Sequence, residues 1–315
     1  MIRRFFHLSL VLAVAAAWTP LAAATTKSNK KKSTTTLSGK PKPKPKPKPK
    51  PKPKPTPAPS VSYAAVPQSA KFPSISAGAA LLVDAATGDV LFQQNADDPR
   101  PVASTQKLLT GLIIAEAGNL DKVVTIQASD TRAEPSKLYL KAGERYRRSD
   151  LLRILLVKSM NDVALALARD HAGSVEAFAG KMNAKAREIG MRNSNFLNPN
   201  GLPAPGQYST PRDMARVALF AYRNSIVRSY VSLRETSFPY ADGRVKTFTN
   251  TNKVLQRWPL CNGMKTGYTN AAGKCLISSA TYEGRHVISL IFNDKEVCED
   301  SYKLLNWGLA GTGAN

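Results

Sequence analysis

The sequence predicts an α/β (α+β) fold in which both ends of the domain contribute strands to one sheet. Two apolar runs, 79–84 and 90–92, flank a Gly-containing turn, a pattern typical of a β-hairpin. A second hairpin is indicated by 275–282 and 286–292, on either side of a short turn at 283–285. The segment between the hairpins has helical periodicity. We therefore expect a helical subdomain inserted between two parts of a single sheet.

Helix starts are marked by side chains that can accept hydrogen bonds from the first free backbone N–H groups. These candidate capping residues are Ser149 or Asp150, Asn161 or Asp162, Ser174, and Thr210. Thr210 is the strongest, because Pro211 and Asp213 follow it. Gly173 and Gly190 are expected to end the second and third of these helices. One further helix is expected from Ser104 onward, and another over 301–309.

The first 73 residues lack Asp and Glu and do not resemble domain material. Arg3 and Arg4, an apolar run over 5–18, and Ala22-Ala23-Ala24 predict a signal peptide over 1–24. That run is short for a membrane span, although an uncleaved anchor stays the alternative. Residues 25–73 are predicted to be a disordered Lys/Pro-rich linker. The catalytic domain then covers 74–315, and the protein is expected in the periplasm or the extracellular cell envelope.

The formal net charge is +23, and much of it comes from lysines of the linker. Nucleic acid is the usual partner of so basic a chain, but export argues against it. The Lys-Pro alternation over 40–55 favours a stiff polyproline II spacer. Its lysines could also contact anionic polymers of the cell envelope.

Three cysteines, Cys261, Cys275 and Cys298, lie near the C-terminus. Because an exported protein meets an oxidising compartment, one disulfide and one free thiol are expected. The sequence does not distinguish the three possible pairings. No Cys-x-x-Cys or His pair accompanies them, so neither a metal site nor another cofactor is predicted.

Ser104 and Lys107 form a Ser-x-x-Lys motif where a loop enters a helix. Residues three apart share a helix face, so the lysine should lie beside the serine. A serine hydroxyl needs a base to become a nucleophile. A lysine serves as that base only if burial or a nearby positive charge lowers its pKa. The motif alone is a weak signal, since a basic chain contains several by chance.

Two further motifs gain meaning from their order after Ser104. Ser159 and Asn161 combine a hydroxyl that can relay a proton with an amide that can grip a substrate amide. Lys265 and Thr266 can bind a carboxylate through charge-assisted hydrogen bonds, while Gly267 leaves room for a substrate backbone. Each motif alone has a structural explanation, but the ordered set favours a serine hydrolase.

The ordered set resembles the motifs of class A β-lactamases and penicillin-binding proteins. Over 79–309 the chain is similar to the low-molecular-weight penicillin-binding proteins, the serine-type D-alanyl-D-alanine carboxypeptidases and endopeptidases. The segments that carry this resemblance are 101–104, 159–162, 196–202, 208–210 with Asp213, and 263–269. The resemblance implies an antiparallel five-stranded sheet of the β-lactamase/transpeptidase-like type. It also implies peptidoglycan stem peptides as substrates and β-lactam antibiotics as inhibitors.

The same resemblance implies three catalytic residues. Ser104 would form an acyl-enzyme, and Lys107 would be the base, although the identity of the base is disputed across the superfamily. Ser159 would pass a proton to the leaving D-alanine nitrogen. The backbone N–H groups of Ser104 and Tyr268 would form the oxyanion hole.

Substrate-binding roles are implied in the same way. Asn161 would position the substrate amide, and Lys265 and Thr266 would hold the terminal carboxylate. Gly267 and Tyr268 are the other two residues expected to bind the substrate. Lys274 is a departure, because an uncharged residue is expected there.

The resemblance leaves several readings open. The family's longer carboxypeptidases continue into a β-rich domain and an anchoring helix that are not seen here, which favours the shorter endopeptidases. A β-lactamase of the same fold is disfavoured because 196–202 contains no acid to hold a hydrolytic water. A histidine-based triad would have to use His171 or His286, neither of which lies near a serine motif. The remaining alternative is a non-catalytic envelope-binding protein.

Overall fold

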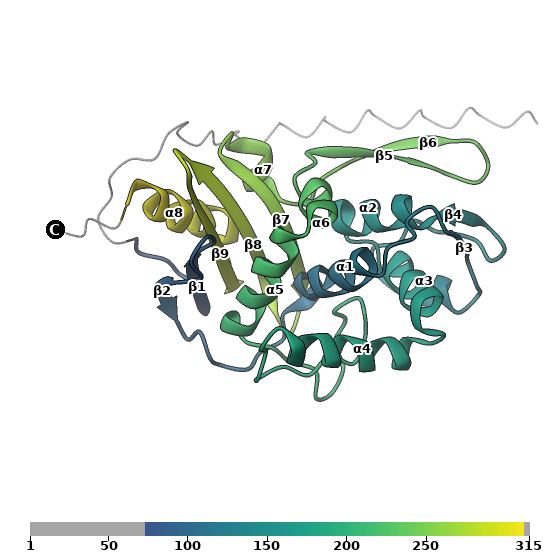
Figure 1. Ribbon diagram of the computed structural model, residues 1–315, viewed down its shortest axis with the longest axis horizontal. Helices are drawn as coiled ribbons and strands as arrows, with labels where there is room; N and C mark the ends of the chain where they lie inside the picture. Colours follow the sequence, from purple (N-terminus) through teal and green to yellow (C-terminus); the bar gives the residue numbers. More distant parts are fainter. Residues whose placement is uncertain (1–72, 312–315) are drawn as a thin grey trace, which may run out of the picture. The chain divides into compact units, whose positions relative to one another are not determined.

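A five-stranded antiparallel sheet with strand order β2-β1-β9-β8-β7 organises the computed structural model (Figure 1). The structure describes residues 73–311, so the predicted signal peptide and nearly all of the predicted linker lie outside the described residues. The five strands are β1 (Ala79–Asp84), β2 (Val90–Gln94), β7 (Cys261–Thr269), β8 (Gly273–Tyr282) and β9 (Arg285–Asp294). The prediction of one sheet built from both ends of the domain is confirmed.

The strand register explains why the two ends of the domain meet. Leu81 of β1 lies opposite Leu290 of β9, which in turn lies opposite Ile277 of β8. Successive side chains of a strand point to opposite faces, so β1, β7, β8 and β9 each contribute to two hydrophobic clusters, one on either face of the sheet. Helix α8 (Val297–Ala310) packs on one face of β8 and β9, and α5 (Pro211–Arg223) packs on the other side (Figure 1). The predicted last helix thus begins earlier than 301.

The segment between β2 and β7 is mainly helical. Two short hairpins are added to the predicted helices, β3 (Val123–Thr125) with β4 (Arg145–Arg147) and β5 (Glu235–Pro239) with β6 (Val245–Thr249). The helices are α1 (Lys107–Glu116), α2 (Arg148–Lys158), α3 (Asn161–Ala172), α4 (Val175–Glu188), α5, α6 (Ser225–Val231) and α7 (Lys253–Arg257). No helix within residues 73–311 is long and apolar enough to cross a bilayer.

Two of the predicted helix caps are confirmed. Ser174 accepts a hydrogen bond from Ala177 N, and Thr210 accepts one from Asp213 N. The caps predicted for α2 and α3 are wrong, since Arg147 and Met160 occupy those positions without side-chain hydrogen bonds.

The reason the α3 caps fail is tertiary. The Asp162 carboxylate accepts hydrogen bonds from backbone N–H groups of Leu138 and Leu140, in another segment. The Asn161 carboxamide accepts a hydrogen bond from Lys107. Near α2, Asp150 accepts one from Arg153 instead of serving as the cap.

The predicted disulfide is absent, because all three cysteines are free thiols. Cys275 lies opposite Gly267, six residues along β7 from Cys261, which corresponds to about 20 Å. A disulfide needs Cα atoms within about 7 Å, so these two cannot pair. Cys275 also packs in the cluster on the α5 side of the sheet, whereas Cys298 packs on the α8 side.

We predict that the unfolded protein, purified without reductant, titrates three thiols per chain with a chromogenic disulfide reagent. In the folded protein Cys298 should react first, because Cys261 and Cys275 are buried and burial raises the pKa of each to about 12. A result of one thiol per chain would show that a disulfide forms.

Candidate active site

Ser104 lies in a short 3-10 turn (Ala103–Gln106) that leads directly into α1. The backbones of Gly201 and Gly267 pack closely against this turn. A Cβ atom on Gly267 would lie 2.9 Å from Ser104 N, and one on Gly201 would overlap the carbonyl of Ala103. Ala103 itself has a φ of +48°, a strained value for a residue with a side chain. The turn that carries Ser104 is therefore held between two backbone segments.

Gly267 also has a role inside the fold, beside the expected one of leaving room for a substrate backbone. The space beside its Cα is filled by Ala103, Ser104 and Thr105 of the same chain. Its lack of a side chain lets β7 contact the 3-10 turn directly.

Lys107 is fully buried, and its ammonium nitrogen lies at the centre of the site. Lys107 Nζ donates to Ser104 Oγ at 2.8 Å, to Asn161 Oδ1 at 2.7 Å and to Asn200 O at 2.7 Å. The Ser104 hydroxyl donates to the same Asn200 carbonyl at 3.2 Å. The first two motifs predicted from the sequence therefore meet at one nitrogen atom.

Burial lowers the pKa of Lys107 well below that of a free lysine, and the positive charge of Lys265 lowers it further. The charge of Asp162 opposes both effects. Burial also raises the pKa of Asp162, which weakens that opposition at low pH. Lys107 can therefore hold a free lone pair next to the Ser104 hydroxyl.

Asn161 links the nucleophile to the loop 134–140. Its carboxamide nitrogen donates to Pro135 O at 2.6 Å, and its backbone N–H donates to Ser136 O at 2.8 Å. Since its oxygen already accepts from Lys107, the side chain is fixed at both ends.

Ser159 lies at the junction of α2 and α3. Its φ of +70° ends α2 and turns the chain into α3, two residues before Asn161. Its side chain is half-buried. The described contacts of Ser159 are made by its backbone, so the structure brings the motif to the site without joining its hydroxyl to Ser104.

The third motif spans both faces of β7. Lys265 is fully buried, and burial lowers the pKa of its ammonium group to about 7. Its Nζ donates to Thr266 O at 3.0 Å. Thr266 is half-buried, and its hydroxyl donates to Thr251 Oγ1 at 2.7 Å. Of the two side chains expected to hold a carboxylate, Thr266 is therefore the more accessible.

Tyr268 follows at the open edge of the sheet, where its side chain is 64% exposed. The contact of Gly267 with Ser104 N brings the backbone of β7 next to the nucleophile just before Tyr268. Both backbone groups expected to form an oxyanion hole thus come from segments in contact.

Sequence reasoning missed the roles of Asn200 and Thr251. Asn200 acts through its backbone carbonyl, which any residue could supply, so its identity gives no signal. Its neighbour Gly201 does carry a sequence signal, because an Asn-Gly pair indicates a turn with positive φ, and the φ of Gly201 is +80°. Thr251 lies in no motif and is found only through its bond to Thr266.

The histidine alternative receives no support from the described residues. His286 stacks on Tyr222 with a centroid distance of 4.0 Å, and burial lowers its pKa to about 4. His171 meets the ring of Phe178 edge-on. Within residues 73–311, Ser104 Oγ has Lys107 and Asn200 as its hydrogen-bond partners.

Comparison with known proteins agrees with this architecture. A family model described as D-alanyl-D-alanine carboxypeptidase matches residues 66–296. The chain is 35% identical over 259 residues to D-alanyl-D-alanine carboxypeptidase DacC of Escherichia coli, covering 78% of this chain and 64% of that protein. It is 30% identical over 256 residues to a D-alanyl-D-alanine endopeptidase of Escherichia coli, covering 78% and 82% respectively. The chain thus spans less than two thirds of DacC.

Solved structures define the class of fold. The DD-transpeptidase of Streptomyces superposes with a TM-score of 0.72 at 30% identity, covering 77% of this chain and all of that one. A D-alanyl-D-alanine carboxypeptidase of Mycobacterium tuberculosis gives 0.73 at 29% identity, covering 80% and 98%. The fold is therefore that of the DD-transpeptidases and DD-carboxypeptidases. With the family match, the chain belongs to the D-alanyl-D-alanine carboxypeptidase family of serine peptidases.

The buried charge of Lys265 leads to a prediction about stability. Its pKa is about 7 when folded and near that of a free lysine when unfolded, so the unfolded chain binds more protons between these values. The free energy of unfolding should therefore rise as the pH rises above about 7. Replacing Lys265→Met removes a buried cation and should stabilise the protein at pH 6 by roughly 1–4 kcal/mol. Denaturant unfolding from pH 6 to 10 checks this, and a destabilised variant at pH 6 would contradict it.

Proposed function

We propose that this protein is an exported serine DD-peptidase that cleaves D-alanyl peptide bonds of peptidoglycan through an acyl-enzyme on Ser104. The supporting observation is the contact of Lys107 Nζ with both Ser104 Oγ and Asn161 Oδ1. The reaction is that of a D-Ala-D-Ala carboxypeptidase or of a DD-endopeptidase, and penicillin acylates the same serine. Its place of action is the periplasm or the extracellular cell envelope.

Acylation begins with proton transfer from the Ser104 hydroxyl to the neutral amine of Lys107. The oxygen then attacks the carbonyl carbon of the penultimate D-alanine. The negative charge that develops on the carbonyl oxygen is stabilised by the backbone N–H groups of Ser104 and Tyr268. Asn161, held at both ends, keeps the acyl chain aligned with the serine.

Collapse of this intermediate breaks the amide C–N bond and leaves the acyl group on Ser104. Ser159 passes to the departing nitrogen the proton that Lys107 took from Ser104, so the nitrogen leaves as an amine and Lys107 is neutral again. Thr266 contacts the carboxylate of the leaving residue, and the charge of Lys265 stabilises it. A water then attacks the ester while Lys107 takes one of its protons. The bond between the acyl carbon and the Ser104 oxygen breaks, Lys107 returns the proton to that oxygen, and the shortened peptide is released.

The two rival readings make different demands on the site. A β-lactamase needs a group that holds a hydrolytic water, and in class A enzymes this is a glutamate. In the described segment 196–202, the group that faces the nucleophile is the Asn200 carbonyl. A non-catalytic envelope protein would have no need of a buried lysine with a lowered pKa beside a serine.

We predict that Ser104→Ala abolishes covalent labelling by fluorescent penicillin and lowers the cleavage of purified muropeptides by at least about a thousandfold. The reason is that no other group can form the ester. Ser229→Ala, an exposed serine on α6, is the matched control and should retain both activities. Labelling that persists in Ser104→Ala would refute the proposal, as would rapid turnover of the penicillin adduct by the wild type.

The lowered pKa of Lys265 predicts how binding depends on pH. Its ammonium group is charged below about pH 7 and neutral above it. KM for a peptide that ends in a free carboxylate should therefore rise with pH above 7, by up to about tenfold per unit. The same peptide with an amidated C-terminus should show no such rise. Steady-state kinetics of the two peptides from pH 6 to 9 test this, and parallel KM profiles would be the contrary result.

A further inference from the structure

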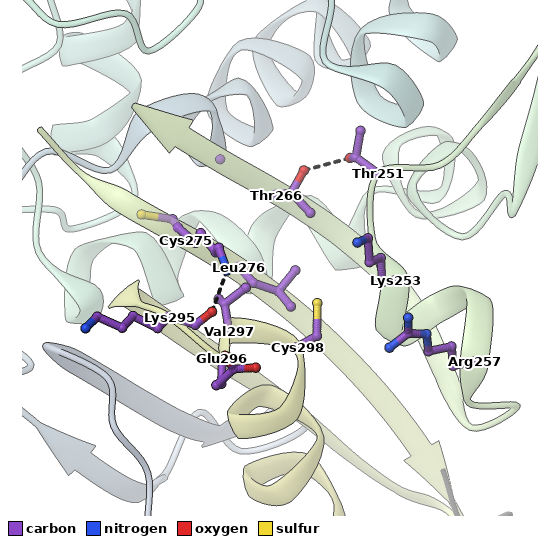
Figure 2. A pocket seen from close by; sticks show the side chains of 12 residues that line it. Thr251, Lys253, Arg257, Thr266, Cys275, Leu276, Lys295, Glu296, Val297 and Cys298 are labelled. Atoms are coloured by element: carbon purple, nitrogen blue, oxygen red, sulfur yellow. Dashed lines mark hydrogen bonds between the residues drawn. The ribbon is translucent and has the colours of Figure 1, made fainter. Parts of the chain in front are cut away.

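A second cavity, of about 310 Å³, lies behind the catalytic strand β7. It shares Thr266 and Gly267 with the active site, and it extends to α7, β8 and the start of α8 (Figure 2). Thr266 lies opposite Leu276, which packs on the α8 side of the sheet, whereas Gly267 meets Ser104 on the other side. The cavity therefore begins where the proposed binding site for the leaving carboxylate ends.

Four cations line this cavity. Lys253 and Arg257 extend from α7 toward β7 and β8 (Figure 2), Lys274 lies on β8, and Lys295 precedes α8. The lining contains one acid, Glu296. Within residues 73–311 none of the four cations forms an ion pair. Lys274 Nζ donates to the backbone carbonyl of Lys295, which is neutral. The positive charge of the lining is therefore not neutralised by ion pairs and favours an external anion.

Three of these charges act on the thiol of Cys298. Burial raises the pKa of the Cys298 thiol, while the positive charges of Lys253, Arg257 and Lys274 all lower it. The Cys298 side chain points into the cavity between α7 and β8 (Figure 2). Lys295 differs, because its side chain points away from α7 (Figure 2). Lys253, Arg257 and Lys274 are therefore the cations that can bind an anion inside the cavity.

The size and charge of the cavity exceed what one D-alanine requires. A released D-alanine carries one carboxylate, which Lys265 and Thr266 already serve in the proposed reaction. A cross-linked substrate has as its leaving group a diamino acid within a second stem peptide, which carries further carboxylates. That leaving group would continue past Thr266 into the cavity.

We propose that the cavity lined by Lys253, Arg257 and Lys274 binds the carboxylates of the second stem peptide in a cross-linked substrate, and so favours endopeptidase cleavage. This inference rests on the proposed DD-peptidase function. It assigns Lys274, the departure noted in the sequence, to recognition of the leaving strand. Because hydrogen bonds between charged groups are strong, each carboxylate should add substantially to the free energy of binding of that strand.

The test compares a purified cross-linked muropeptide dimer with a monomeric pentapeptide ending in D-Ala-D-Ala. The double variant Lys253→Gln/Arg257→Gln should lower kcat/KM for the dimer at least about tenfold, mainly through KM. It should leave kcat/KM for the monomer within about twofold. The control Lys181→Gln/Arg187→Gln removes equal charge from the exposed surface of α4 and should change neither.

A chemically modified dimer isolates the carboxylates. When the carboxylates of the second stem peptide beyond the scissile residue are amidated, kcat/KM of the wild type should fall as far as it does in the double variant. The kcat/KM of the double variant should not fall further. Additive losses would overturn the inference, as would equal losses on dimer and monomer, or a wild type that cleaves the monomer alone. In each of these cases DD-peptidase activity survives. A wild type that cleaves neither substrate and takes no penicillin label would instead refute the proposed function and this inference with it.

Discussion

The active site depends on two lysines that are fully buried close to each other without a hydrogen-bonded carboxylate. Within residues 73–311, Lys107 donates to the neutral oxygens of Ser104, Asn161 and Asn200, and Lys265 donates to a carbonyl of its own strand. A bonded carboxylate would fix a proton on either amine and remove its use. In the proposed reaction, the absence of that partner lets Lys107 serve as a base and leaves the charge of Lys265 for a substrate carboxylate. The burial of both costs stability, as expected where function requires strain.

This arrangement requires that the three segments that carry the motifs, which are distant in the sequence, are held together in the fold. Gly201 and Gly267 let two backbones close on the turn that carries Ser104, and any side chain at either position would push them away. Asn161 ties α3 to the loop 134–140, whose backbone N–H groups are gathered by the Asp162 carboxylate. The sheet holds β7 in place through its long ladder with β8. Chemistry at one nitrogen atom thus depends on contacts spread over the whole domain.

The sequence predicted the sheet and the three motifs because both depend on local pattern: apolar runs around turns, and short fixed spacings. It failed where a side chain is used by a distant segment. Asn161 and Asp162 have the composition of helix caps but bind other parts of the fold. The expected disulfide is absent, since all three cysteines are free. Strand register, which sequence does not give, separates Cys261 from Cys275, and Cys275 and Cys298 pack on opposite sides of the sheet. Complete burial of Lys265 was equally invisible, since lysine is rarely buried.

The position of β7 at the edge of the sheet connects the catalytic site with the cationic cavity. An edge strand offers unpaired N–H and C=O groups to which an extended peptide can add as a further strand. Because side chains alternate along β7, Gly267 faces the nucleophile while Thr266 faces the cavity. A peptide lying along this edge would therefore meet the serine and the cations in sequence. In the proposed reaction, the strand that places a carbonyl at Ser104 therefore also directs the departing peptide toward positive charge.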